Sequence, residues 1–319
     1  MTQLLRSHGR DSRWRLVDGV LLLDKGAGMT SSAAVQRVRR LFRAQKAGHT
    51  GTLDPLATGL LPICLGEATK FSHVLLDADK SYVATIRLGV TTRTGDLEGE
   101  VTARQAVRAG REDVEHALQG FMGEILQTPP MYSALKRDGQ PLYKLARAGA
   151  DIPRAARRIM IHKVDLLGME GEELVLFVSC SKGTYVRVLA EDLGRALGCG
   201  ACLAGLRREG VGNFSLASGA VTLERLEDMA PAERDALLLS ADVLVSGLPR
   251  LELDSRAALR LSQGQAVAHH GAHASGLARL YGPGGLFLGV GEVEEAGRIV
   301  PRRLVSEARV AVADRASID

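Results

Sequence analysis

Aromatic residues are scarce in this chain of 319 residues: they make up 4%, with one tryptophan, five tyrosines and six phenylalanines. This shortage argues against an RNA-recognition surface that stacks several bases on aromatic platforms. It also makes each tyrosine at a functional position more informative. Apolar residues still account for 45% of the sequence, which is ample for one large domain or two smaller ones.

Cysteines are few and lack the grouping of a metal site. The four are Cys64, Cys180, Cys199 and Cys202. The last two form a CxxC motif, but no second CxxC or CxxH pair lies nearby to complete four ligands. We therefore predict reduced, small buried cysteines and no bound metal.

The sequence also lacks a secretory signal and a membrane-spanning run. The N-terminal residues MTQLLRSHGR have no apolar core, and no apolar run reaches the length that crosses a bilayer. We expect a cytoplasmic protein that does not enter a membrane. The net charge of +4 permits an anionic partner but does not prove one.

The most informative stretch is residues 48–71, GHTGTLDPLATGLLPICLGEATKF, which we term the signature stretch. It holds one aspartate, Asp54, in a largely apolar run. Pro55 fixes its own φ and disfavours helical geometry at Asp54, so we expect a rigid, extended corner. A carboxylate among apolar residues is costly unless it has a partner or a task. Asp before Pro is also a common helix start, so Asp54 could instead cap a helix over residues 55–61.

The signature stretch resembles the pattern GHxGxLDPxAxGxLxxxxGxATK of the TruB family of tRNA pseudouridine synthases, and the resemblance extends over about residues 22–305. By motif position it implies that Asp54 is the catalytic nucleophile. It implies that His49 fills the place that the flipped target base vacates. Taken alone, a histidine in a glycine-rich loop is a local hydrogen-bonding residue, and we assign His49 no acid–base role.

Two further residues follow the signature stretch. Tyr82 begins the inward-facing row of a strand expected over residues 81–88, where it could be an ordinary core tyrosine. The resemblance implies that its ring stacks on the target base and takes part in proton transfer. Asp96, in a turn-rich loop, could be a simple turn residue. The family has an acidic residue here that is tied to its catalytic arginine.

The segment KGTYVR, residues 182–187, predicts a loop between a strand and an amphipathic helix that ends near residue 197. In the resembling family its tyrosine and arginine line the active site, which implies roles for Tyr185 in substrate binding and for Arg187 in catalysis. An arginine beside a buried carboxylate keeps it charged and orients it. Leu206, in an LRR segment, is either a pocket residue as in the family or an ordinary core leucine.

Two lysines complete the expected site. The segment DKGAGMTS, residues 24–31, resembles the family's DKPxGxTS, with Gly26 where proline is usual, so we expect a more flexible loop. Lys25 is predicted to contact a phosphate or the backbone. The segment PPMYSALK, residues 129–136, matches PPxYSAxK and gives Lys136 as a further substrate-binding residue.

A helix is expected after Thr30, which offers an N-cap, with Val35 and Val38 on its inner face. Its arginines lie largely off that face; they are Arg37, Arg39, Arg40 and Arg43. They form either a solvated surface or an RNA contact.

The predicted organisation has four parts: a flexible basic tail over residues 1–16, a catalytic domain over 17–248, a PUA-like RNA-binding domain over 249–312, and a tail over 313–319. A basic insertion around 136–163 holds eight Lys and Arg against two Asp. It is either a phosphate-tracking surface or a solvated face. From residue 250 onward, short apolar runs separated by Gly and Pro predict a small β-barrel.

These features predict an α+β fold: a pseudouridine synthase catalytic domain with a mixed or antiparallel central sheet flanked by helices, plus a small C-terminal β-barrel-like PUA domain. The resemblance implies isomerisation of uridine 55 in the T loop of tRNA, with base flipping. It implies no cofactor and no obligatory protein partner, and we expect a monomer.

Three alternatives remain open from the sequence. The chain could be an RNA-binding or tRNA-folding protein on the same fold, or a guide-RNA-dependent pseudouridine synthase that works inside a complex. It could also be a hydrolase with Asp54 as nucleophile, which would want a second carboxylate or a metal cluster.

Overall fold

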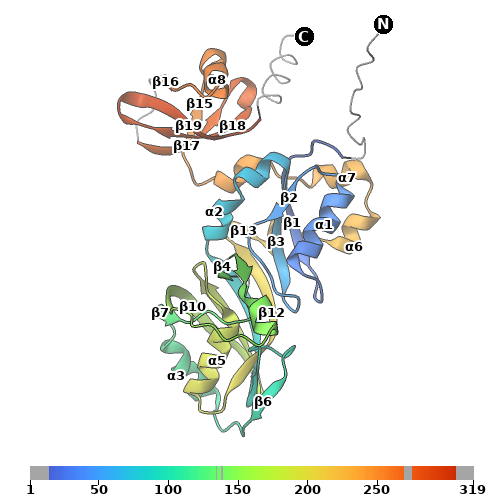
Figure 1. Cartoon of the computed structure of the whole chain (residues 1–319), viewed down its shortest axis with the longest axis vertical. Coiled ribbons are helices and arrows are strands. Elements are labelled where there is room, and N and C mark those ends of the chain that lie inside the picture. The colour runs from blue at the N-terminus through green and yellow to red at the C-terminus, as the bar shows by residue number, and fades with distance from the viewer. Residues whose placement is uncertain (1–13, 134, 138, 269–274, 307–319) are drawn as a thin grey trace.

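The computed structural model describes residues 14–133, 135–137, 139–268 and 275–306 of the chain (Figure 1). It combines one large mixed sheet, helices packed against it, and a smaller C-terminal sheet. The predicted α+β fold is therefore confirmed. Within the described residues, no helix is both long and apolar enough to cross a membrane.

The large sheet has ten strands, and most neighbours in it are antiparallel. In spatial order its main path is β14 (Val221–Thr222), β1 (Gly19–Lys25), β3 (Thr58–Leu65), β12 (Ala201–Val211), β4 (Lys80–Leu88), β11 (Glu173–Cys180), β10 (Arg157–Glu170) and β7 (Gly123–Gln127). Two short strands join it, β2 (Ala47–His49) beside β3 and β13 (Phe214–Ser215) beside β12. The parallel pairs are β14 with β1 and β3 with β12. The second of these brings the signature stretch against the LRR segment.

Helices cover the sheet in two groups. The α-helices outside the C-terminal sheet are α1 (Ser31–Leu41), α2 (Ser72–Asp77), α3 (Arg111–Gln119), α4 (Leu142–Arg147), α5 (Val186–Ala196), α6 (Leu223–Asp228) and α7 (Pro231–Ala236). Short 3₁₀ helices are η1 (Gly66–Lys70), η2 (Leu216–Ser218) and η3 (Ala241–Val245), and two small hairpins are β5 (Val90–Thr92) with β6 (Val101–Arg104) and β8 (Lys136–Arg137) with β9 (Gln140–Pro141). Figure 1 shows α1, α6 and α7 beside β1 and β3, and α3 and α5 in the half of the molecule that holds β10.

Helix α1 forms as its sequence predicts. The Thr30 hydroxyl accepts a hydrogen bond from the Ala33 amide at 3.1 Å and so caps the first turn. Val35 and Val38 are buried against the sheet, while most of the polar side chains face outward. The apolar stripe packs α1 on the core, and its opposite face stays free to carry charge.

Strand β4 also forms as predicted, with strict alternation of buried and half-buried residues. Its inward row includes Tyr82, Ala84, Ile86 and Leu88, and each of these is buried. A strand with period-2 burial has one face on the core and therefore a fixed register. That register sets the position of Tyr82.

The helix that Asp54 could have capped over residues 55–61 does not form. Strand β3 begins at Thr58 instead, and its continuous apolar run is buried between β1 and β12. Gly59 has φ of +98°, and a Cβ atom there would lie 2.3 Å from the Arg208 carbonyl oxygen. Only glycine allows this close approach of β3 to β12. The tertiary pairing of the strands therefore overrides the local helix signal.

Strand β10 begins at Arg157, inside the predicted basic insertion. Its first half pairs with β7, and its second half forms a hairpin with β11. Arg157 and Arg158 are exposed on this strand. Because these positions are charged, a search of the sequence for alternating apolar residues does not detect the start of this strand.

The C-terminal residues form a curled, half-barrel-like sheet with its own small core (Figure 1). Its strand order is β15 (Arg250–Glu252), β17 (Gly276–Tyr281), β18 (Phe287–Val293), β19 (Arg298–Leu304) and β16 (Val267–Ala268), with α8 (Ser255–Ser262), η4 (Pro283–Gly285) and η5 (Glu295–Gly297). Phe287 packs on Phe71 with ring centroids 5.5 Å apart. Ser306 binds Glu67 through its amide and hydroxyl. The C-terminal sheet therefore shares an apolar contact with the larger part.

The predicted flexible tail over residues 1–16 is wrong at its last positions. The Arg15 amide donates to the Arg43 carbonyl at 2.6 Å, and its guanidinium binds both carboxylate oxygens of Asp235. These contacts fix Arg15 against α7. Residues 1–13 and the predicted tail over 313–319 lie outside the described residues.

Candidate active site

A cavity of about 330 Å³ opens where the signature stretch, β4, β12 and the start of α5 meet. Five of the residues predicted for the site line it; they are Asp54, Tyr82, Tyr185, Arg187 and Leu206. They come from segments far apart in the sequence, and the fold collects them around one space.

The loop that carries Asp54 is held from both sides. The Ser31 hydroxyl, at the start of α1, accepts from the Leu53 amide at 2.8 Å and donates to the Leu53 carbonyl at 2.9 Å. The Ala57 amide donates to the Asp54 carbonyl at 3.1 Å. The Asp54 side chain is 42% exposed, so the carboxylate stands at the cavity with room for another molecule beside it.

Arg187 is the direct partner of Asp54, with Nη2 lying 3.0 Å from Oδ2. Its guanidinium is almost fully buried and also donates to the Thr94 and Tyr132 carbonyls at 3.0 and 2.6 Å. Asp96, equally buried, lies 3.5 Å from Nη1. A planar guanidinium held at several points presents a fixed fork to the carboxylate. Arg187 therefore neutralises one buried acid and orients the exposed one.

Tyr82 stands opposite Arg208 in the β4–β12 pairing, and its hydroxyl interacts with the Arg208 guanidinium. Burial raises the pKa of Tyr82, and the positive charge of Arg208 opposes that rise. Burial also lowers the pKa of Arg208. The pair gives the cavity a phenol beside a buried cation.

Arg208 is the main residue of the site that sequence reasoning missed. It is 1% exposed, and it donates to the Leu60 carbonyl at 2.7 Å and to the Gly51 carbonyl at 3.1 Å. No carboxylate pairs with it among the described residues. It thus binds the backbone on both sides of Asp54. Strand alternation offered a signal, because Arg208 lies two residues after Leu206 and shares its face.

Tyr185 precedes α5 and is held by the side chain of Gln127. The Tyr185 amide donates to Gln127 Oε1 at 2.7 Å, and Gln127 Nε2 donates to the Tyr185 carbonyl at 3.1 Å. Gln127 is buried at the end of β7, and nothing in the sequence marked it. This amide pair fixes the backbone from which Tyr185 enters the cavity. Leu206, which is half-buried, also lines the cavity.

His49 ends β2 and does not line the cavity. Its Nδ1 accepts a hydrogen bond from the Gly51 amide at 3.2 Å. Burial, and then the positive charge of Arg208, lower the pKa of His49, so the ring is neutral at neutral pH. This hydrogen bond fixes the imidazole ring beside the residues that lead into the Asp54 loop.

Of the two partners predicted for Lys25, a phosphate or the backbone, the structure shows contacts with backbone carbonyls. Its side chain is fully buried, and its ammonium donates to the carbonyls of Gly26, Met29 and Pro55 at 2.9, 2.8 and 3.5 Å. Burial lowers its pKa to about 8. Lys25 ties its own loop to the residue after Asp54. It acts as a positioning residue.

Lys136 lies in β8, and its side chain is outside the described part of the structure, so its predicted role in substrate binding stays a prediction. A lysine that the sequence did not indicate, Lys80, does line the cavity. It donates to the Leu75, Leu76 and Ala78 carbonyls at the end of α2, and burial lowers its pKa to about 8.

The four cysteines are all buried and unbridged. Burial raises the pKa of Cys64 to about 12 and that of Cys180 to about 11, so both remain thiols at neutral pH. No group of three or more His, Cys, Asp or Glu that could hold a metal occurs among the described residues.

Comparison with solved structures places this fold among known proteins. A chain in the crystal structure of a Cbf5–Nop10–Gar1 complex matches with a TM-score of 0.68 and 25% identity, covering 91% of this chain and 86% of that one. A chain in the archaeal box H/ACA Nop10–Cbf5 complex matches with a TM-score of 0.67 and 23% identity, covering 93% and 88%. These matches extend over nearly the whole architecture.

Family models define the class as a pseudouridylate synthase. Residues 39–186 match the N-terminal domain model of TruB family pseudouridylate synthases, residues 187–246 match the C-terminal domain model of tRNA pseudouridylate synthase B, and residues 249–305 match the C-terminal model of pseudouridine synthase II TruB.

Curated relatives agree with these models. The tRNA pseudouridine synthase B of Methylobacillus flagellatus is 55% identical over 92% of this chain and 97% of its own length. That of Aromatoleum aromaticum is 56% identical over 92% and 94%. The chain belongs to the TruB family.

Proposed function

We propose that the chain isomerises uridine 55 in the T loop of tRNA to pseudouridine, with Asp54 as the nucleophile. The observation that carries this proposal is the contact between Asp54 and Arg187 at the mouth of a cavity that also holds Tyr82. The relatives named tRNA pseudouridine synthase B, matched over almost their whole length, support tRNA as the substrate.

The reaction needs no oxidant, reductant or group donor. The bond between uracil N1 and the ribose C1′ breaks, the base turns, and a bond from C5 to C1′ forms. The C5 proton leaves, and N1 takes up a proton. The carboxylate of Asp54 serves as a covalent nucleophile and is released unchanged.

Arg187 has two tasks in this scheme. It stabilises the Asp54 carboxylate as a substrate displaces water from the exposed side, because an adjacent positive charge offsets part of the cost of desolvating a carboxylate. It also fixes the direction of Oδ2, since the guanidinium is held by carbonyls and by Asp96. A fixed nucleophile lowers the entropic cost of attack.

Tyr82 stacks on the detached base and handles the C5 proton. The form of Tyr82 that can accept a proton is the phenolate. Burial raises the pKa of Tyr82 and so makes this form scarce. The Arg208 guanidinium beside it favours the phenolate form and so assists proton removal. Arg208 thereby supports both the proton step and the backbone around Asp54.

The base must leave the T loop before it can enter the cavity, which costs roughly a few kcal/mol. Tyr185 and Leu206 form the walls that receive it. In this proposal His49, which is neutral and hydrogen-bonded to the Gly51 amide, fills the space that the base vacates in the T loop. The basic insertion around 136–163 and the C-terminal sheet supply phosphate contacts.

The test is tritium release from an unmodified tRNA transcript labelled at uridine C5, with purified wild type and Asp54→Asn and no added metal or cofactor. We expect release by wild type only, and mapping of the product to position 55. No release by wild type, or release from another position, would refute the proposal. Mass measurement in solution tests the further expectation of a monomer, and turnover by the purified chain tests the expectation that no protein partner is obligatory.

A guide-RNA-dependent activity is the second candidate, because the matched Cbf5 chains belong to complexes with other proteins. The identity to the curated relatives is about twice as high as to these chains. Turnover by the purified chain on tRNA alone would exclude a guide-RNA-dependent activity. Dependence on added guide RNA would favour it.

A further inference from the structure

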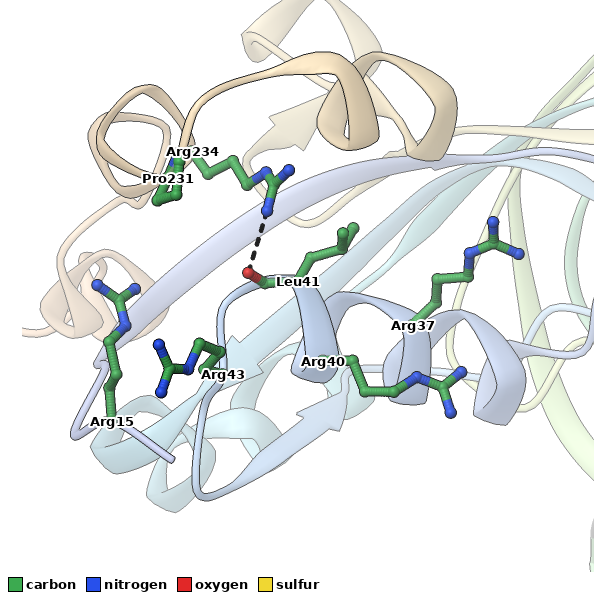
Figure 2. Close-up of a pocket in the computed structure, with 7 residues that line it drawn as sticks. All are labelled: Arg15, Arg37, Arg40, Leu41, Arg43, Pro231 and Arg234. Atoms are coloured by element: carbon green, nitrogen blue, oxygen red, sulfur yellow. Dashed lines mark hydrogen bonds between the residues drawn. The ribbon is translucent and has the colours of Figure 1, made fainter. Parts of the chain in front are cut away.

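A second, strongly basic cavity lies away from the candidate active site. It has a volume of about 520 Å³ and is lined by Arg15, Arg37, Arg40, Leu41, Arg43, Pro231 and Arg234 (Figure 2). We term it the arginine hollow. Five of its seven lining residues are arginines, and no acidic side chain lines it within the described residues.

Tertiary structure assembles the arginine hollow from three segments. Arg15 comes from the residues before β1, Arg37 and Arg40 from α1, and Arg234 from α7. Arg234 holds the wall together, because it donates to the Leu41 carbonyl at 3.2 Å, to the Leu226 carbonyl at 2.7 Å and to the Glu227 carbonyl at 3.1 Å. Figure 2 shows the hydrogen bond from the Arg234 guanidinium to the Leu41 carbonyl, at the end of α1.

The acids nearest the hollow do not cancel its charge. Asp235 pairs with Arg15, and Glu227 pairs with Arg37, both on partly exposed side chains. Arg40 is exposed, and the described residues offer it no ion pair or hydrogen bond. Exposed pairs contribute little and are easily exchanged for a stronger ligand. The hollow therefore keeps an excess of positive charge.

A simpler explanation is that arginines in the last turn of α1 offset the negative end of its helix dipole. It accounts for Arg39 and Arg40, which lie in that turn. It does not account for Arg15 and Arg234, which reach the same cavity from other segments. The convergence of three segments points to a ligand with several negative charges.

We infer that the arginine hollow binds phosphate groups of the tRNA substrate as a second contact outside the active site. Guanidinium groups suit phosphate because they donate in pairs to its oxygens. A cavity of this size, with charges spread around it, fits a run of phosphates along a backbone. This inference rests on the proposed function for the identity of the RNA.

Helix α1 connects the two sites. Its first residue, Ser31, holds the Asp54 loop, and its last turn borders the hollow. Eleven residues of helix span about 15 Å. A folded tRNA is large enough to place one base in the active site and phosphates at this distance. The hollow thus contributes binding and carries no base specificity.

The test is charge reversal at Arg40. Because the Arg40 side chain is exposed and makes no ion pair or hydrogen bond with the described residues, Arg40→Glu should fold normally, as its thermal melt will show. We expect its Kd for an unmodified tRNA transcript to rise about tenfold and the slope of log K against log salt to fall by about one. The rate at saturating tRNA should stay at the wild-type value.

The matched control is Arg108→Glu, at an exposed arginine before α3 in the other half of the molecule. It makes the same charge change and should leave Kd and the salt slope nearly unchanged. Equal losses in the two variants would overturn the inference, because they would reflect net charge only. Wild-type binding by Arg40→Glu would overturn it as well.

Two further arms separate the possible outcomes. Trp14, the only tryptophan of the chain, stacks on Arg39 beside Arg15, so its fluorescence reports on this region. Saturation of that signal by inorganic phosphate or pyrophosphate, lost in Arg40→Glu while tRNA binding persists, would assign the hollow to a free anion and overturn the RNA assignment. Weaker tRNA binding by Arg40→Glu with no tritium release by wild type would support the hollow and refute the proposed reaction.

Discussion

The candidate active site and the arginine hollow both gather cations, but they hold them differently. In the active site Lys25, Arg187 and Arg208 are buried, and their donors are taken by carbonyls or by acids. In the hollow the arginines are largely exposed, and Arg40 has no partner among the described residues. A buried cation that is fully bonded positions other groups, whereas an exposed one can accept a ligand.

The difference can be read in what each cation binds. Lys25 and Arg208 attach to the backbone on both sides of Asp54, at Pro55 and at Gly51. Buried polar groups need such partners, since an unbonded buried cation is very costly. The result is a rigid catalytic loop. The hollow instead has exposed charge, as at Arg40, which is open to an anionic ligand.

The largest effect in this comparison is expected at Asp54. Asp54→Asn keeps the shape of the side chain but removes the nucleophile, so turnover should fall by more than about 1,000-fold. Binding of tRNA should remain close to wild type, because the phosphate contacts lie elsewhere. Tritium release and filter binding measure the two quantities. Substantial turnover by this variant would remove Asp54 from the mechanism.

Arg187 should show the next largest effect. Arg187→Ala should lower the rate at least about 100-fold, because Asp54 loses its orienting fork. It also leaves Asp96 buried without a cation, which can cost about 3–5 kcal/mol of unfolding free energy.

The double variant Arg187→Ala/Asp96→Asn separates these two losses. It removes the unpaired acid and should recover much of the stability while the rate stays low. Recovery of the rate together with the stability would show that Arg187 acts only on the fold. Single-turnover kinetics and chemical denaturation provide the two readouts.

Arg208 and Arg40 test the buried-versus-exposed distinction directly. Arg208→Met leaves the Leu60 and Gly51 carbonyls without their donor, so unfolding free energy should fall by about 3 kcal/mol. Arg40→Met should change it by less than about 0.5 kcal/mol. Urea titrations of both variants give the comparison. Similar losses would mean that the hollow is a structural feature rather than a binding surface.

Lys25 should give the smallest effect, visible as a pH dependence. Its pKa of about 8 is below its ordinary 10.5, so between these values the unfolded chain holds a proton that the folded chain has lost. The unfolding free energy of wild type therefore gains from this group as pH rises through the window.

Lys25→Met lacks this contribution. Its stability relative to wild type should shift by about 2 kcal/mol in favour of wild type between about pH 7 and about pH 10. The contributions of the other titrating groups to the unfolding free energy are the same in both proteins and cancel in this difference. Lys46→Met, at an exposed lysine, controls for the loss of one positive charge. A constant difference across this range would show that burial does not depress the pKa of Lys25.

The C-terminal sheet calls for charge variants rather than truncation. Deleting residues 250–319 would remove Phe287 from Phe71 and uncover part of an apolar cluster. A loss of RNA binding after truncation would then mix a binding effect with exposure of that cluster. Reversal of exposed arginines on β19, such as Arg303, avoids this problem.

Local patterns predicted much of the fold. The alternating apolar residues located β4, and the Thr30 cap with the apolar stripe located α1. Local patterns did not predict two regions, and each failure has a physical reason. Strand β10 carries charge on its exposed face, and the residues after Asp54 pair with β12 instead of forming a helix.

For the site, the sequence by itself determined the residue types and their motifs: a carboxylate on a stiff corner at Asp54, an arginine at the start of α5, and tyrosines where few exist. Only the tertiary structure decided which cations are buried and which face water. Burial and strand register depend on pairings between segments far apart in the chain, such as β4 with β12, which local periodicity does not encode. For the same reason only the structure could add Arg208 to the active site, show which carbonyls Lys25 binds, and assemble the arginine hollow from three distant segments.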